Sequence, residues 1–228
     1  MRSLPGIFAV SLTLALTACS EEQAEAPAAP PAKTETAPPA AAPDSATADE
    51  AKTADDGAGA GAEPFFAQMV LQDVTFQVES PNDSSINQVT VRAEGPEGPI
   101  GHMEAEADGT ITNVEIEDLN ADGYPEIYVY VTSAGSGSYG SLIAYASNQN
   151  KSLSQIYLPS IEDDPAISKG YMGHDEFAVG EATFLRRFPI YKDGDINAQP
   201  TGGTRQIQYK LEAGEAGWIL RQDRVVEF

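Results

Sequence analysis

Two apolar segments with a strict two-residue period, joined by a loop of small residues, constrain the fold of this chain more than any other feature. In residues 127–131 three aliphatic side chains alternate with two tyrosines, and a similar alternation occupies residues 142–146. Successive side chains of a β-strand point to opposite faces, so this pattern predicts two paired strands. Residues 133–140 carry only small side chains apart from Tyr139, and we expect a slender hairpin loop there.

The same short-strand pattern recurs through the C-terminal part of the chain, with turns rich in Gly, Pro and Asn between the segments. Besides the central hairpin, strands are predicted in residues 74–78, 89–91, 111–116, 153–158, 177–179, 182–191, 205–211 and 217–226. Only residues 161–172 are expected to contain a helical turn. Short strands repeated about every ten residues are typical of antiparallel sheets. We therefore predict an all-β fold, an antiparallel β-sandwich with a barrel as the alternative.

The N-terminal segment predicts export and lipid attachment. Residues 1–18 begin with a basic Met-Arg pair and continue with a mainly apolar run that is too short for a comfortable membrane span, as in secretory signal peptides. The run ends in Leu-Thr-Ala-Cys, which resembles the bacterial lipoprotein box and implies that Cys19 is diacylated and becomes the new N-terminus. Because Ser20 follows instead of aspartate, we expect a periplasm-facing protein attached to the outer membrane of a Gram-negative bacterium.

The next segment has the composition of a linker. Residues 20–63 contain no Leu, Ile, Val, Phe or Tyr and are dominated by Ala, Pro, Thr and acidic residues. Such a segment cannot bury enough apolar surface to offset the entropy lost on ordering. We therefore predict that residues 19–63 form a lipidated, disordered tether and that residues 64–228 form one folded domain.

The chain is strongly acidic, with a formal net charge of −22. The first 63 residues hold three basic and ten acidic side chains, which leaves ten basic and 25 acidic residues, a charge of −15, for the domain. A field of this sign repels nucleic acids and attracts cationic proteins, so we expect no nucleic-acid partner. Arg186 and Arg187 adjoin in a predicted strand and should face opposite sides, which argues against a shared anion clamp.

An acidic turn precedes the central hairpin. Asp118, Asn120 and Asp122, followed by a glycine, have the spacing of the first half of a calcium-binding loop. The glutamate that completes an EF-hand is missing at the twelfth position, and Glu126 occurs three residues too early. Asp and Asn side chains also cap the backbone amides of tight turns without any ion. We expect no obligatory cofactor, and these four residues remain candidate calcium ligands.

Residues suited to catalysis are present without a supporting motif. His174 and Asp175 could act on Ser168 or Ser138, but the sequence has no nucleophile-elbow motif and only one other histidine, His102. Pairs of carboxylates, which glycoside hydrolases use, occur by chance in a chain this acidic. We therefore predict that the protein is not an enzyme.

The loop of the central hairpin contains groups that suit binding. The stretch Ser136-Gly137-Ser138-Tyr139 combines small residues with one phenol ring. The Ser136 hydroxyl both donates and accepts hydrogen bonds, and Tyr139 offers a rigid contact that loses little entropy on ordering. Composition alone nevertheless favours a plain flexible hairpin loop.

Four segments resemble a known family: DLNADGYPEIYVYV, SAGSGSYGSLIAYA, GYMGHDEFAVGEATFLRRFPIYKDGD and TGGTRQIQYKL. They are similar to the periplasmic inhibitors of invertebrate-type (i-type) lysozyme, the PliI family, and the resemblance covers most of residues 64–228. It implies a β-sandwich domain that inhibits lysozyme by inserting an SGxY loop into the active-site cleft.

Ser136, Gly137 and Tyr139 match the SGxY pattern. The resemblance implies that Ser136 hydrogen-bonds a catalytic carboxyl of the lysozyme and that Tyr139 anchors the loop against the cleft wall. Lysozymes are generally cationic, so the acidic domain would attract them. Cys19 and the tether depart from a family described as periplasmic and soluble. The alternative function is a calcium-dependent envelope-binding or structural module organised by the turn at residues 118–126.

Overall fold

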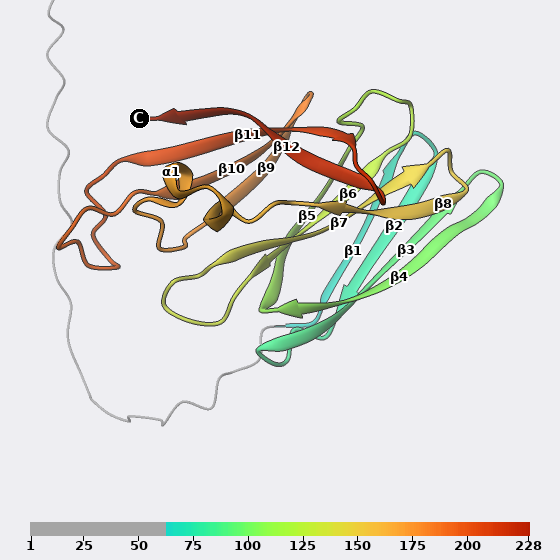
Figure 1. The fold of residues 1–228 in the computed structure, drawn as a ribbon. Helices are drawn as coiled ribbons and strands as arrows, with labels where there is room; N and C mark the ends of the chain where they lie inside the picture. The colour runs from blue at the N-terminus through green and yellow to red at the C-terminus, as the bar shows by residue number, and fades with distance from the viewer. Residues whose placement is uncertain (1–62) are drawn as a thin grey trace, which may run out of the picture. The chain divides into compact units, whose positions relative to one another are not determined.

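The computed structural model describes residues 63–228, and the predicted signal peptide, Cys19 and nearly all of the predicted tether lie outside this range. The described part consists of twelve strands and two short helices, which confirms the predicted all-β fold (Figure 1). The helices, η1 (Ile161–Asp163) and α1 (Pro165–Ser168), lie in the segment expected to hold a helical turn. Within residues 63–228, no helix has the length and apolarity needed to cross a membrane.

The strands form one four-stranded and one eight-stranded sheet. The smaller sheet has the order β1-β2-β3-β4, and the larger has the order β5-β6-β7-β8-β12-β11-β10-β9. The strands are β1 (Phe65–Leu71), β2 (Val74–Ser80), β3 (Ile86–Gly95), β4 (Gly98–Asp108), β5 (Thr110–Glu117), β6 (Glu126–Thr132), β7 (Gly140–Asn148), β8 (Ser152–Tyr157), β9 (Glu176–Gly180), β10 (Thr183–Pro189), β11 (Thr204–Ala213) and β12 (Trp218–Glu227).

One strand pair departs from the predicted antiparallel arrangement. Strands β8 and β12 are parallel, with Trp218 opposite Ile156 and Ile219 opposite Tyr157. Parallel neighbours require a long crossover connection, and the chain supplies one because both helices and strands β9–β11 lie between them. The pairing joins the β5–β8 half of the larger sheet to the β9–β12 half.

The larger sheet is nearly closed. Its edge strands β5 and β9 approach each other. Glu115 on β5 accepts a 2.8 Å hydrogen bond from the backbone N–H of Val179 on β9 and a second one from the Tyr130 hydroxyl. The smaller sheet packs against the larger one through contacts of β1 with β5 and of β4 with β6, β7 and β8. The fold therefore combines the predicted sandwich with the barrel-like alternative.

Strand β6 is buried along both faces, because each face belongs to a different hydrophobic core. Ile127, Val129 and Val131 pack toward the smaller sheet in the first core. Tyr128 and Tyr130 lie in the second core, which fills the interior of the larger sheet. The two-residue period of the sequence therefore divides one strand between two cores.

Two strands are missing from the sequence prediction, β1 and β4. In β4, Met103, Ala105 and Ala107 face inward and alternate with exposed polar and charged residues. The two-residue period is present, but Ala and Glu are poor strand formers. Their low strand propensity explains why the sequence pattern does not predict β4. Strand β1 lies at the edge of its sheet, and its residues are half-buried at most.

The second core gives a direct test of the packing. Phe184 is fully buried and its ring contacts those of Tyr128, Tyr130, Phe177 and Tyr209. Replacing Phe184 by Ala should lower the free energy of unfolding by about 3–5 kcal/mol. The substitution leaves a cavity, and the closely packed neighbouring rings cannot move to fill it. Urea unfolding followed by circular dichroism measures the loss.

The matched control is Phe66→Ala, since Phe66 is 63% exposed on the edge strand β1. It should change the free energy of unfolding by less than about 0.5 kcal/mol. Equal losses for the two variants would contradict the assignment of the second core.

Candidate functional site

The predicted binding loop, residues 133–139, connects β6 to β7 (Figure 1). Three hydrogen bonds within the loop fix its shape. The backbone N–H of Ser133 donates to the carbonyl of Tyr139 at 2.9 Å, and the Tyr139 N–H donates to the Ser133 hydroxyl at 3.0 Å. At the tip, the Ser138 N–H donates to the Gly135 carbonyl at 3.2 Å. The loop is therefore a closed turn rather than an open, flexible segment.

A second loop segment supports the first from the side. The backbone N–H of His174 donates to the carbonyls of Gly137 and Ser138, at 2.8 and 3.2 Å. Two glycines permit this close approach. A Cβ atom on Gly173, whose φ is +87°, would lie 2.0 Å from the Gly137 carbonyl oxygen, and one on Gly137 would lie 2.4 Å from the Tyr139 ring. The Gly173 contact is with the backbone, so glycine is required there, whereas a side chain at Gly137 would displace the Tyr139 ring from its present position.

Asn197 holds the other side of the loop. Its side-chain amide donates to the carbonyl of Ser136, and its Oδ1 lies 3.0 Å from Nε2 of His174. The backbone carbonyl of Asn197 accepts a 2.9 Å hydrogen bond from the Tyr191 hydroxyl. The loop is thus supported by residues that are about 35 to 61 positions distant in the chain.

A buried ion pair fixes the base of the loop. Asp175 Oδ1 accepts a 2.7 Å hydrogen bond from Nε of Arg186, and the two side chains are 0% and 7% exposed. Asp175 Oδ2 accepts from the backbone N–H of Gly140 at 2.7 Å and from the Tyr171 hydroxyl at 2.6 Å. Burial lowers the pKa of Arg186, but the Asp175 carboxylate more than offsets this, so the pKa is raised and the guanidinium stays charged.

The groups that the sequence predicted for binding lie on the outside of this framework. Ser136 and Tyr139 are both exposed, and 48% of Tyr139 is accessible to solvent. The edge of the Tyr139 ring meets Tyr171 at a centroid distance of 5.6 Å and an interplanar angle of 76°. The loop is therefore fixed at its base and sides, while a hydroxyl and part of a phenol ring remain free to contact another molecule.

The potential catalytic residues come together without forming a triad. His174 does adjoin Ser138, but it contacts the Ser138 carbonyl through its backbone N–H and turns its ring toward Asn197. The Asp175 carboxylate is occupied by Arg186, Tyr171 and Gly140. Neither His174 nor Asp175 is therefore positioned to act as a base on Ser138.

The two adjacent arginines face opposite sides, as predicted, since Arg186 is buried and Arg187 is exposed. Arg186 forms the buried ion pair with Asp175 at the base of the loop, which the sequence does not predict. No local pattern reveals this pair, because an acidic residue near an arginine is common in such a chain.

The acidic turn between β5 and β6 has the hydrogen bonds of a tight turn. Asp118 accepts from the backbone N–H groups of Asp122 and Gly123, at 3.0 and 2.9 Å. Asn120 Oδ1 accepts from Asp122 N–H, and Asp122 Oδ1 accepts from Tyr124 N–H, both at 2.9 Å. Amide capping, one of the two sequence interpretations, therefore accounts for these three side chains.

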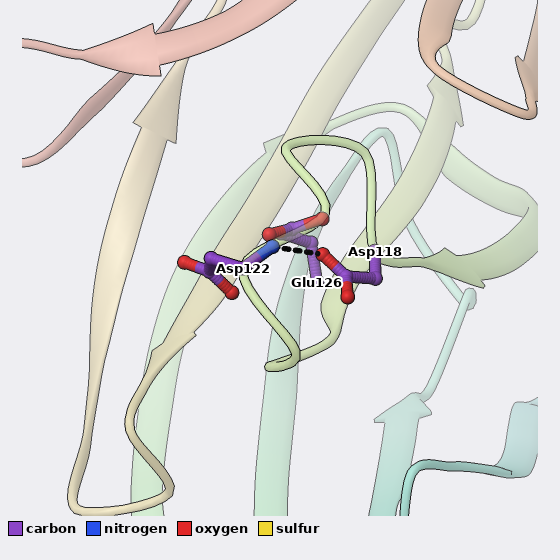
Figure 2. A group of neighbouring side chains, drawn as sticks. All are labelled: Asp118, Asp122 and Glu126. Atoms are coloured by element: carbon purple, nitrogen blue, oxygen red, sulfur yellow. Dashed lines mark hydrogen bonds between the residues drawn. The ribbon is translucent and has the colours of Figure 1, made fainter.

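Glu126 differs from the other residues of the acidic turn because it is buried, with 1% of its surface exposed. Burial raises the pKa of its carboxyl to about 8, and the nearby carboxylates of Asp118 and Asp122 add to the effect, although a hydrogen bond from Leu119 N–H opposes it. In the view of Figure 2 the Glu126 carboxylate lies between those of Asp118 and Asp122.

A fixed, exposed loop on an acidic β-domain is typical of a protein that binds another macromolecule. The family model of the periplasmic lysozyme inhibitors of I-type lysozyme matches residues 100–167, which include both the acidic turn and the loop. None of the curated proteins matches the chain.

Two solved structures of relatives are similar to this chain. One is PliI of Aeromonas hydrophila in complex with Meretrix lusoria lysozyme, which is 32% identical over 40% of this chain and 80% of the relative, with a TM-score of 0.36. The other is PliI-Ah, the inhibitor of I-type lysozyme from Aeromonas, also 32% identical, over 40% of this chain and 84% of the relative, with a TM-score of 0.36.

This identity over most of the relative's length, together with the family match, shows that the chain belongs to the family of periplasmic inhibitors of I-type lysozyme. The family consists of inhibitor proteins, which confirms the prediction that the protein is not an enzyme. The match begins at residue 100, so β1–β3 lie before it.

The buried ion pair should be a main source of stability for the loop. Replacing Asp175 by Ala leaves the Arg186 charge buried without a partner, so we expect the free energy of unfolding to fall by about 3–5 kcal/mol. The control is Glu212→Ala, because Glu212 pairs with Arg221 at 2.9 Å where both side chains are more than half exposed. That variant should lose less than about 1 kcal/mol. Urea unfolding of both variants measures the difference, and similar losses would show that Asp175 is not an anchor.

Proposed function

We propose that this protein inhibits a lysozyme of the I-type by inserting the loop Ser136-Gly137-Ser138-Tyr139 into the active-site cleft, and thereby protects bacterial peptidoglycan. The observation that carries the proposal is the exposure of Ser136 and Tyr139 on a loop whose backbone is fixed by its neighbours. Family membership supplies the target class, and a relative has been crystallised with a lysozyme.

The fixed backbone favours tight binding. A flexible loop loses conformational entropy when it enters a cleft, and this cost is subtracted from the affinity. Here the hydrogen bonds that His174 and Asn197 donate, and the one that Asp175 accepts from Gly140 at the base of the loop, already restrict the loop in the free protein. In the proposed complex the Ser136 hydroxyl hydrogen-bonds a catalytic carboxyl and the Tyr139 ring packs against the wall of the cleft.

The charge of the domain contributes to the rate of encounter. Residues 64–228 carry a formal charge of −15, and a cationic enzyme is drawn toward such a surface. Charges outside the contact mainly change the association rate, whereas the buried loop sets the dissociation rate. Raising the salt concentration should therefore slow association more than it speeds dissociation.

The proposed insertion is tested by removing the two exposed groups. Ser136→Ala and Tyr139→Ala together should weaken inhibition by about tenfold or more, because aromatic anchors at interfaces commonly contribute a few kcal/mol. The measurement is the residual activity of i-, c- and g-type lysozymes titrated with the protein. The unfolding temperature should stay close to that of the wild type, since both side chains are exposed.

The matched control is Tyr157→Ala, since Tyr157 is 55% exposed on β8 and belongs to another part of the surface. It should inhibit like the wild type. If the loop variant inhibits fully, the loop has no part in the mechanism, even if the protein remains an inhibitor.

We further propose that Cys19 carries lipid and holds the domain at the outer membrane, where it faces the periplasm. The lipoprotein-box resemblance supports this, and the residue lies outside the described range. In a Gram-negative host, the wild type should be found in the outer-membrane fraction, Cys19→Ala in the soluble fraction, and Ser20→Asp in the inner-membrane fraction. Recovery of the wild type as a lipid-free soluble protein would refute the anchor.

A further inference from the structure

Glu126 has a feature that neither the tight turn nor the lysozyme loop accounts for. It is the first residue of β6, and the two-residue period places it on the same face as Tyr128 and Tyr130, toward the interior of the larger sheet. Its Oε2 atom accepts hydrogen bonds from the Leu119 N–H at 2.8 Å and from the Tyr128 hydroxyl at 3.4 Å. Its Oε1 atom is buried and has no hydrogen-bond partner among residues 63–228.

An unpaired buried carboxylate oxygen is costly, because it has lost its water without gaining another partner. The nearest charged groups make the cost larger. Asp118, Asp122 and Glu126 each offer one carboxylate oxygen, and these three atoms lie within 4.8 Å of one another. None of the salt bridges in the described part of the chain includes any of the three. Gln72, which is neutral, donates to Asp118 at 2.8 Å.

Amide capping explains the turn but not this convergence. Asp118 and Asp122 accept backbone N–H groups, which orients their carboxylates. Asp118 Oδ2 accepts two hydrogen bonds, whereas Asp118 Oδ1 and both oxygens of Asp122 accept one each and retain a second lone pair. Oε1 of Glu126 takes no part in closing the turn, yet it is buried without a partner among residues 63–228. The carboxyl group that carries it lies close to those of Asp118 and Asp122 (Figure 2). A cation would satisfy the unpaired oxygen and the facing charges together.

We propose that Asp118, Asp122 and Glu126 bind a calcium ion, with the side-chain oxygen of Asn120 on the same turn as a further ligand. The donors are all oxygen atoms, which suits a hard cation and disfavours zinc. Three carboxylates supplied by the protein, two from an irregular turn and one from the start of β6, fit the flexible coordination of calcium better than the strict octahedral geometry of magnesium.

The ion would have a structural role that is separate from inhibition. The turn precedes β6 and the Ser/Gly loop follows it, so the two lie about 20 Å apart along a strand of seven residues. A bound ion would hold the turn over the end of the second core, which Leu119 and Tyr128 help to form. It would also strengthen the link to Gln72 in the β1–β2 turn.

The test is calorimetric titration of the full chain with CaCl₂ after treatment with EGTA, together with unfolding temperatures in CaCl₂ and in MgCl₂. We expect one saturable site with a dissociation constant of about 1 mM or lower, and a larger rise in unfolding temperature with calcium than with magnesium. Glu126→Gln and Asp122→Asn should each weaken calcium binding by about tenfold or more. Asp122 is exposed, so its variant folds even if the buried substitution does not.

The control is Glu106→Gln, which removes one exposed carboxylate of β4, outside the cluster. A chain with a net charge of −22 attracts calcium diffusely, and this control measures that contribution. Glu106→Gln should bind calcium like the wild type. If no saturable binding is found at millimolar calcium, or if all three variants bind equally, the site does not exist. The outcome does not depend on inhibition, because no lysozyme is present.

Discussion

Strand β6 contributes one face to each of the two hydrophobic cores, and the rest of the domain packs against these two faces. Antiparallel sheets commonly leave one face in water. Here the smaller sheet covers Ile127 and its neighbours, while the interior of the larger sheet takes up Tyr128 and Tyr130. The strand therefore cannot slip by one residue, because a slip would exchange the aliphatic and aromatic faces. The turns at its two ends are fixed in place as a result.

The loop after β6 shows how a glycine-rich sequence can form a fixed structure. Its glycines do not make it flexible, since Gly137 leaves room for the Tyr139 ring, and Gly173 lets the neighbouring loop approach closely. The fixing contacts come from Asp175, His174 and Asn197, whose positions depend on the packing of the larger sheet. Binding surface and scaffold are thus separated: the exposed side chains remain free, and the backbone is set by buried polar contacts.

Most of the fold and part of the site follow from local patterns, and the remainder does not. The central hairpin, the turn before it and the exposed loop could all be located because their signals span only a few residues. Strand β4 was missed because Met103 and its alanine neighbours form a weakly apolar inner face. The ion pair of Asp175 and Arg186 was missed because an acidic chain offers many such combinations, and only burial distinguishes this one. The parallel pairing of β8 with β12 has no local signal either.

The sequence by itself determined the all-β class, the alternation that gives β6 two apolar faces, the SGxY loop and the ligand-like spacing of the acidic turn. These depend on covalent order and side-chain period, which a chain carries before it folds. Only the tertiary structure decided that the loop is held from three sides, that Oε1 of Glu126 is buried without a hydrogen-bond partner among the described residues, and that the carboxyl groups of Asp118, Asp122 and Glu126 converge. The reason is physical: burial and the loss of water depend on what packs above a residue, and that is supplied by segments distant in the sequence.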